Sequence, residues 1–286
     1  MMGYRELKPN INKYPNKVGL FCNARDEKNM KEWATHHLLI GFDIIIIFDH
    51  LSEQPLSREF LKFDPRVVII RLDVNMLDIK TYLNNRATSI AKQYNMDWFL
   101  YLDADEFLIL NHIANVRFKN IKHFLKTYSY ADSIGINWVM FGSNYLVKEP
   151  TSGLLIENYN RSSLLLDKHV KSIVRTNKVK NADNPHYYHL FCSEKMMGVD
   201  LKKMSPPFCF NPLNMSFHEA PVYIAHYVYQ SEESYFKRKI RLIADNGTIR
   251  ENLGIKIHEL YNDVVNEQPQ KYVNDIKMFI DFWKNK

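Results

Sequence analysis

The stretch DWFLYLDADE, residues 97–106, joins an apolar run to three closely spaced carboxylates. Trp98–Leu102 has the continuous apolar character of a strand that is buried on both faces of a sheet. Asp103, Asp105 and Glu106 follow at the point where that strand would end. A buried strand that ends in carboxylates predicts a polar site at one edge of a sheet.

The residues before this stretch alternate between two patterns. Short apolar runs predict strands at Val18–Asn23, Ile44–Phe48 and Val67–Leu72, and helical spacing of apolar residues predicts helices at Glu27–Ile40 and Ile79–Tyr94. Strands that alternate with helices predict a parallel sheet with right-handed crossovers. The expected fold class is therefore α/β, with a Rossmann-like sheet flanked by helices.

Polar residues also follow the first and second predicted strands, at 23–27 and 49–52. Ligands of open parallel sheets bind at the carboxyl ends of the strands, so we expect these clusters and residues 103–106 to meet. Asp49 can accept a hydrogen bond from a nucleobase or a ribose, or it can be a turn or cap acid. Arg25 suits a phosphate or an internal carboxylate. Asp26 and Glu27 can equally be charges at a helix N-terminus.

Asp103 and Asp105 form an Asp-x-Asp motif, which is weak evidence by itself because it also occurs by chance. Its position at a strand end is more informative, since crowded carboxylates repel one another unless a cation neutralises them. Hard divalent ions take oxygen ligands and bridge to phosphates. The chain has only nine glycines and no glycine-rich phosphate loop, so a metal ion is one way to hold a phosphate. The alternative is a pair of loop acids that cap the next segment.

The chain beyond residue 110 predicts a different organisation. We expect a helix at Ile121–Tyr128, a strand at Ser133–Met140, and helices at Ser231–Ala244 and toward the C-terminus. Short strands and loops are expected between 150 and 225. We interpret residues 1–286 as one domain: a nucleotide-binding half at about 17–110, an acceptor half at about 111–245 and a C-terminal helical segment at about 246–286.

Composition excludes several classes of protein. Hydrophobic residues make up 46% and charged residues 24% of the chain, the balance of a globular protein. Three cysteines without metal-ligand spacing indicate reduced thiols, and no apolar run reaches the length of a membrane span. We therefore expect a soluble, cytoplasmic protein without a signal peptide or membrane anchor, in the host cytoplasm if the source is a virus. Basic residues do not alternate with aromatic ones, so no nucleic-acid partner is expected.

Several candidate residues lie in the acceptor half. His226, within an apolar run, is by itself more typical of a core histidine. His169, His186 and His189 lie in the loop-rich region and could line an acceptor pocket. No nucleophile triad is present, and the pattern alone does not single out a general base among four acidic residues, which are Glu149, Glu157, Asp167 and Glu194.

Five stretches of the chain resemble one known family. They are NARDEKNMKEWATHHLLIGFDIIIIFDHLS (23–52), DWFLYLDADEFLIL (97–110), WVMFGSN (138–144), HVKSIVRTNKV (169–179) and IAHYVYQSEESYFKRKIR (224–241). In this order they resemble segments of glycosyltransferases of family 92 and the related family 2-like group, among them E-W-x-x-H, D-x-D-E-F, W-x-x-F-G-S, K-x-I-V-R and H-Y-x-x-x-S-x-E-x-F-x-x-K.

The resemblance implies a GT-A fold and a metal-dependent transferase that uses a nucleotide sugar, with a UDP-sugar favoured. It implies that Asp103, Asp105 and His226 bind a divalent cation, manganese before magnesium. The residues implied to contact the nucleotide sugar are Asn23, Arg25, Glu27, Asp49, Asp103, Lys171 and Arg175, although Lys171 and Arg175 could instead meet structural acids.

The expected reaction is a direct displacement with inversion, in which a deprotonated acceptor hydroxyl attacks the anomeric carbon. Glu157 is the nominated general base. The acceptor could be a glycan, a lipid-linked sugar or a protein. The basic residues of the predicted helix 231–244 could contact an anionic membrane, although a solvated basic face is the more ordinary role. The alternative function is an inactive module of the same fold that binds a sugar nucleotide or a glycan.

Overall fold

The first half of the chain forms four parallel strands. The computed structural model of the protein describes residues 17–74, 76, 78–184, 186–192, 195–240 and 256–286. Strands β1 (Val18–Ala24), β2 (Ile44–His50), β3 (Val67–Leu72) and β4 (Trp98–Asp103) lie side by side in the order β3-β2-β1-β4. All pairs among them are parallel. The predicted strands and their parallel arrangement are confirmed.

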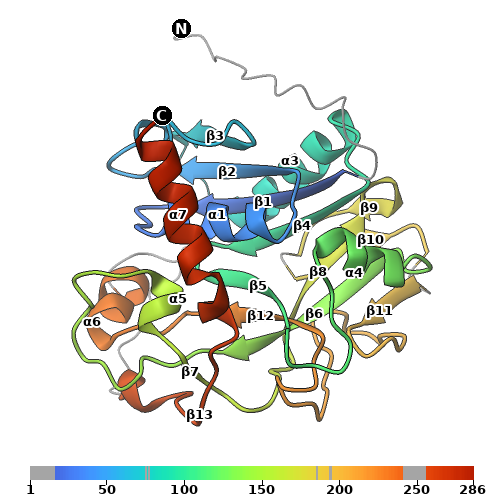
Figure 1. Ribbon diagram of the computed structural model, residues 1–286. Helices are drawn as coiled ribbons and strands as arrows, with labels where there is room; N and C mark the ends of the chain where they lie inside the picture. The colour runs from blue at the N-terminus through green and yellow to red at the C-terminus, as the bar shows by residue number, and fades with distance from the viewer. Residues whose placement is uncertain (1–16, 75, 77, 185, 193–194, 241–255) are drawn as a thin grey trace, which may run out of the picture.

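Helices cover both faces of these strands, as Figure 1 shows. Helix α1 (Met30–Leu39) lies on one face, and α3 (Ile79–Gln93) lies on the other, where its apolar side packs on β1, β2 and β4. Gly41 follows α1 with a φ of +104°, a conformation that glycine adopts without steric cost. The short helix α2 (Leu56–Glu59) follows β2.

The second half extends the sheet beyond β4 with strands of both directions. Next to β4 lies β8 (Val170–Arg175), followed by β6 (Ser133–Met140), β12 (Val222–His226) and β5 (Glu106–Leu110). Strands β8 and β5 are antiparallel to their neighbours, whereas β6 and β12 are parallel to each other. A short strand, β11 (Met196–Gly198), pairs with β6 and completes a nine-stranded sheet.

This topology brings distant segments to one edge of the sheet. The carboxyl ends of β4, β6 and β12 lie at the same edge as the first residues of β5 and β8, because the latter two run in the opposite direction. Strand β5 is a finding that the sequence pattern did not predict. The chain turns at Ala104 and Asp105, and β5 then pairs with β12 at the far side of the second half.

The remaining elements surround this sheet. They are α4 (Ile121–Thr127), α5 (Leu155–Asn158), α6 (Glu232–Tyr235), the π-helical turn Phe236–Ile240, α7 (Val273–Lys284), the 3₁₀ turns Thr176–Lys178, Ile257–Glu259 and Pro269–Tyr272, and two small sheets that pair β9 (Val179–Asn181) with β10 (His189–Leu190) and β7 (Arg161–Ser162) with β13 (Val264–Val265). Helix α7 packs against α1 (Figure 1).

The predicted helix at 231–244 begins as expected, with the Ser231 hydroxyl capping the backbone N–H of Ser234 at 3.1 Å. It then changes to a π-helical turn at Phe236, and the end of the predicted helix lies outside the described residues. One core cluster draws on residues from both halves of the sheet. The structure is thus a mixed α/β fold with a mostly parallel central sheet between helices. Within the described residues, no helix has the length and apolar character needed to cross a bilayer.

Candidate functional site

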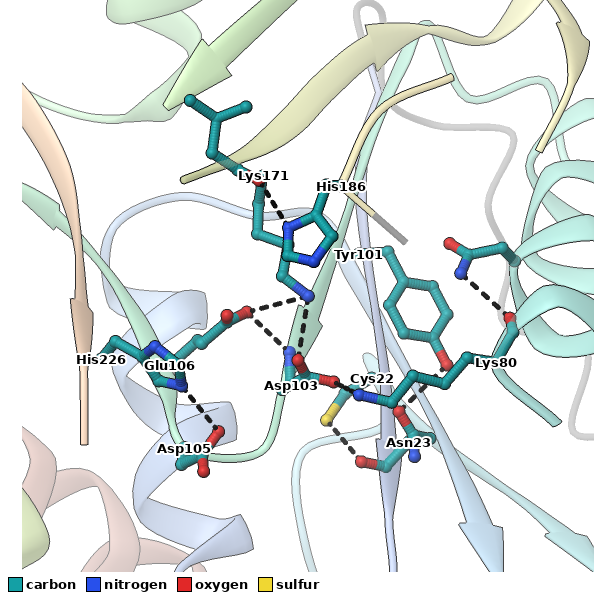
Figure 2. Close-up of polar contacts among 12 residues, drawn as sticks. Cys22, Asn23, Lys80, Tyr101, Asp103, Asp105, Glu106, Lys171, His186 and His226 are labelled. Atoms are coloured by element: carbon teal, nitrogen blue, oxygen red, sulfur yellow. Dashed lines mark hydrogen bonds and ion pairs between the residues drawn. The ribbon is translucent and has the colours of Figure 1, made fainter. Parts of the chain in front are cut away.

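The carboxylates after β4 meet basic side chains from three other parts of the chain. Asp103 is the last residue of β4, and its two oxygens each contact a lysine Nζ at 2.9 Å, Lys80 from α3 and Lys171 from β8 (Figure 2). Burial alone would favour the neutral acid, but the two lysines outweigh it and hold the pKa of Asp103 well below its usual range. Asp103 is therefore ionised and bound on both oxygens.

Asp105 lies in the turn between β4 and β5 and is almost wholly buried. Its Oδ2 contacts Arg238 Nη2 and Lys239 Nζ, each at 3.0 Å, from the π-helical turn. Its Oδ1 lies 3.7 Å from Nε2 of His226, the last residue of β12. Burial favours the neutral acid here too, but Lys239 and Arg238 outweigh it and lower the pKa of Asp105. Arg238 also contacts Glu27, at 3.2 Å, and so connects the site to the loop after β1.

Glu106 has the opposite protonation behaviour. Its side chain is fully buried, its Oε2 accepts the backbone N–H of Asp103 at 2.9 Å, and Lys171 Nζ lies 3.6 Å away. Burial, aided by the negative charge of Asp103, raises the pKa of Glu106 to about 8, despite the attraction of Lys171. At neutral pH Glu106 is therefore mostly protonated, whereas the two aspartates beside it are ionised.

The residues after β1 lie next to these acids. Asn23 is in register with Asp103 on the neighbouring strand, and its Oδ1 accepts a hydrogen bond from the Tyr101 hydroxyl at 3.4 Å (Figure 2). Arg25 and Glu27 line a cavity of about 590 Å³ that also borders Arg238. A polar cavity therefore lies at the carboxyl end of β1, beside the side chains that bind Asp105.

Asp49 has a more enclosed position than the sequence suggested. It is fully buried, and its Oδ2 accepts hydrogen bonds from the backbone N–H of Leu56 at 3.0 Å and from Arg71 at 3.1 Å. These contacts match the alternative role of a cap acid at the start of α2. Its Oδ1 is buried without a hydrogen-bond partner among the described residues.

Two predicted residues lie apart from the acids at the end of β4. Arg175 is at the other end of β8, because β8 runs antiparallel to β4; it stacks on Trp98 at 4.4 Å and donates to the carbonyls of Ala131 and Ser129. Glu157 accepts the backbone N–H of Leu154 and forms an ion pair with Lys277 of α7 at 2.8 Å. Both residues have structural partners, and none of these contacts joins them to Asp103, Asp105 or His226.

A group of aromatic rings includes His226, which faces Asp105. We call Trp138, His169, His186 and His226 the Trp138 cluster. Ring centroids lie 4.4 Å from Trp138 for His226, 5.1 Å for His169 and 5.4 Å for His186. Figure 2 shows His186 and His226 on either side of the Asp103–Glu106 carboxylates. Burial lowers the pKa of His186 and of His226 to about 4, so both rings are neutral at pH 7. His189 lies elsewhere, on β10, where it pairs with Asp183.

Sequence reasoning missed three of the basic residues, Lys80, Arg238 and Lys239. Lys80 lies in the first turn of α3, a helix whose N-terminus follows β3 and faces the same sheet edge. Arg238 and Lys239 were noted only as part of a basic helix face. The run of acids was the signal that could have predicted such basic partners, because buried carboxylates require neighbouring cations.

The side chains of this site supply only some of the ligands that a divalent cation needs. Asp105 Oδ1 and His226 Nε2 lie 3.7 Å apart, and the other nitrogen of His226 is buried without a hydrogen-bond partner among the described residues. This oxygen–imidazole pair can supply two ligands. Asp103 could join them only by exchanging a lysine partner, and no group of three or more His, Cys, Asp or Glu in the described parts of the chain is arranged to hold a metal ion. Any such ion would take its remaining ligands from substrate and water.

Comparisons with known proteins give structural matches only. No protein-family model matches the sequence, and no curated protein matches it. Similar solved structures include HddC from Yersinia pseudotuberculosis, with 10% identity, a TM-score of 0.39, and coverage of 78% of this chain and 97% of HddC. S. aureus TarS 1-349 in complex with UDP has 14% identity and a TM-score of 0.35, and the match covers 57% of this chain and 48% of TarS.

A third similar structure is glucosyl-3-phosphoglycerate synthase from Mycobacterium tuberculosis in complex with Mn²⁺, UDP and phosphoglyceric acid. It has 8% identity and a TM-score of 0.33, and the match covers 57% of each chain. The matches to TarS and to the synthase thus span about half of those chains. Similarity at this level concerns the arrangement of strands and helices and does not identify a substrate.

Proposed function

We propose that this protein is a glycosyltransferase that transfers a sugar from a nucleoside-diphosphate sugar, UDP-linked in preference, to a hydroxyl acceptor. The observation that carries the proposal is the cluster at the end of β4. There Asp103 and Asp105 meet His226 and four cationic side chains, Lys80, Lys171, Arg238 and Lys239, at the carboxyl edge of four parallel strands. This is the edge where sheets of this kind bind nucleotides.

The charge arrangement suits a diphosphate leaving group. When the bond between the sugar and the phosphate breaks, negative charge develops on the diphosphate, and preorganised cations stabilise it. Arg238 and Lys239 are held by Asp105 and Glu27, so they are already oriented before a ligand binds. We propose that Arg238 and Lys239 also donate hydrogen bonds to the diphosphate.

We further propose that Asp105 and His226, with Asp103 as the third candidate, hold a divalent cation. Because one ligand is an imidazole, manganese suits the set better than magnesium, which prefers oxygen ligands. When bound, the cation would act as a Lewis acid on the diphosphate. The buried, neutral state of His226 keeps a lone pair available for this role.

The residues around the cavity of about 590 Å³ are proposed to hold the rest of the donor. Arg25 is suited to the phosphates, and Asn23 and Glu27 to sugar or ribose hydroxyls. The buried oxygen of Asp49 that lacks a partner among the residues that the structure describes is the atom we assign to a nucleoside contact. Direct displacement with inversion is the proposed stereochemistry, with a glycan, a lipid-linked sugar or a protein as acceptor.

Calorimetry with UDP, GDP, CDP, dTDP and ADP, each with and without Mn²⁺, tests the proposal. One nucleotide that binds only with the metal supports it and names the donor class. Binding of none of them would overturn it. Identification of the product separates the alternatives: a nucleoside diphosphate indicates a glycosyltransferase, pyrophosphate indicates a nucleotidyltransferase, and binding without turnover indicates a sugar-nucleotide-binding module.

A further inference from the structure

His169 of the Trp138 cluster forms a close pair with an aspartate, Asp167. His169, the residue before β8, contacts the ring of Trp138, and Trp138 in turn contacts His226. His169 Nδ1 lies 2.6 Å from Asp167 Oδ1, and the backbone N–H of His169 donates to the same oxygen at 2.8 Å. The side chain of His169 is 35% exposed, so it reaches solvent while one ring nitrogen is held firmly.

The aspartate is itself fixed by backbone hydrogen bonds. The N–H of Asp167 donates to the carbonyl of Trp138 at 2.8 Å, and the carbonyl of Asp167 accepts from the Asn137 side chain at 2.9 Å. The N–H of Trp138 donates to the carbonyl of His169 at 3.1 Å. Three neighbouring hydrogen bonds therefore hold the pair against β6, a rigid strand of the central sheet.

This geometry decides which nitrogen of His169 carries the proton. An ionised carboxylate only accepts hydrogen bonds, so Nδ1 must be the donor to Asp167. In the neutral ring, Nε2 then has a lone pair, and the described residues supply no hydrogen bond to it. A histidine whose Nδ1–H is held by a carboxylate, with Nε2 free at the solvent side, has the arrangement of a general base.

The other candidates for this role are less suited. His186 donates its Nδ1–H to the carbonyl of Val170 at 3.0 Å and has no carboxylate partner in the described chain. His226 lies against Asp105, within the charged cluster. Glu157 is engaged by Lys277 of α7.

We propose that His169, oriented by Asp167, is the general base that removes the proton from the acceptor hydroxyl. This inference rests on the proposed glycosyltransferase function. The hydroxyl proton moves to His169 Nε2 as the oxygen forms a bond to the anomeric carbon. The bond from that carbon to the phosphate oxygen breaks, the diphosphate leaves with the electron pair, and the imidazolium then returns its proton to water. Trp138 and Phe210, whose rings lie 5.1 and 4.9 Å from that of His169, flank the acceptor.

The test compares His169→Gln with Asp167→Asn, Glu157→Gln and a control, His123→Gln, which changes an exposed histidine on α4. The assay is release of UDP from UDP-hexoses with water or a methyl hexoside as acceptor. We expect His169→Gln to lower kcat by about 100-fold or more, the range of a lost general base, with unchanged affinity for UDP and Mn²⁺. The His123→Gln control is expected to keep wild-type kcat.

Asp167 is a positioning residue, so its variant has its own readout. Asp167→Asn should lower kcat by about tenfold, less than loss of the base itself, and leave KM for the UDP-hexose unchanged, whereas a merely structural role would change KM and UDP affinity too. Added imidazole should restore part of the activity of His169→Ala.

Three outcomes would overturn the assignment. If His169→Gln keeps kcat near that of the wild type, or if Glu157→Gln alone abolishes turnover, His169 is not the base although the glycosyltransferase function stands. If the wild type binds no nucleotide and releases no UDP from any UDP-hexose, the function and the base assignment both fail.

Discussion

Two parts of this molecule place a tryptophan beside histidines, and they differ in whether the indole nitrogen has a hydrogen-bond partner. In the α1 cluster, which is Trp33, His36 and His37, the indole N–H donates to the carbonyl of Glu106 at 2.7 Å. Both histidines bond to backbone atoms, although Nδ1 of His36 has no partner among the described residues. All three side chains are fully buried. In the Trp138 cluster, the indole nitrogen and Nδ1 of His226 have no partner among the described residues, and His169 is partly exposed.

The two clusters also differ in what they contact. The α1 cluster attaches helix α1 to strand β5, since Trp33 and His36 bond to β5 carbonyls and the N–H of Leu108 donates to His37 at 3.2 Å. It thereby holds the strand that starts at Glu106. The Trp138 cluster lies at the edge of the sheet where His226 meets Asp105, with 3.7 Å between His226 Nε2 and Asp105 Oδ1.

The largest effect is expected for Asp105→Asn, which removes the charge that His226, Arg238 and Lys239 face. Affinity for UDP with Mn²⁺ should fall by about 100-fold or more, the order seen when a preorganised charge contact is lost. Calorimetry measures the affinity, and circular dichroism checks that the variant is folded. Unchanged affinity would contradict the assignment of Asp105 as a metal ligand, and with it the proposed role of the Trp138 cluster beside Asp105.

Trp33→Phe should lower the free energy of unfolding by about 2–3 kcal/mol, because the carbonyl of Glu106 loses its buried donor and the smaller ring leaves a void. Urea denaturation measures the effect. The activity of the folded fraction should remain, since Trp33 acts through the position of β5. A variant that is stable but inactive would show that the α1 cluster is more than structural.

His36→Phe sharpens the comparison through pH. Burial lowers the pKa of His36 to about 4, from 6.5 in the unfolded chain, so the unfolded state binds more protons between these values. The contribution of neutral His36 to the free energy of unfolding is therefore complete above pH 6.5 and is lost as the pH falls toward 4. The variant should reduce the slope of unfolding free energy against pH by up to about 1.4 kcal/mol per unit in this window.

The wild-type slope contains an opposing contribution. Burial raises the pKa of Glu32 from 4.5 to about 7, so the folded state binds more protons and stability falls as the pH rises between these values. The difference between wild type and His36→Phe, measured by urea denaturation at several pH values, removes this shared background. Parallel curves for the two proteins would contradict a buried, neutral His36.

The smallest effect is expected for Trp138→Phe. Its indole N–H has no hydrogen-bond partner in the described parts of the chain, so the free energy of unfolding should change by less than about 1 kcal/mol. The loss of aromatic contact should raise KM for the acceptor by roughly 2–10-fold, which corresponds to a contact worth about 0.5–1.5 kcal/mol. UDP-release kinetics measure KM. A stability loss as large as that of Trp33→Phe would erase the distinction between the two clusters.

Much of the first half could be predicted from the sequence. The apolar runs of β1, β2, β3 and β4 and the periodicity of α1 and α3 are local signals, and the structure confirms them. The position of Asp103 and Asp105 at the end of β4 followed from the same pattern. Strand β5 escaped prediction because its apolar run directly follows the acids, and its pairing with β12 lies more than a hundred residues away.

The residues that neutralise the acids could not be predicted in the same way. Lys80, Lys171, Arg238 and Lys239 come from a helix, an antiparallel strand and a π-helical turn. Arg175 shows the limit most clearly, because it shares β8 with Lys171 but lies at the other end of the strand, beside Trp98. Only the strand direction decides which of the two meets Asp103.

The sequence by itself determined the α/β class, the parallel strands and the carboxylates at their edge, because these depend on periodicity and on contacts between near neighbours. The tertiary structure decided which cations face those carboxylates, that burial raises the pKa of Glu106 while neighbouring cations lower that of Asp105, and that Asp167 holds His169 beside Trp138. These properties arise from burial and from charges brought together across the sheet, and no local pattern in the chain encodes them.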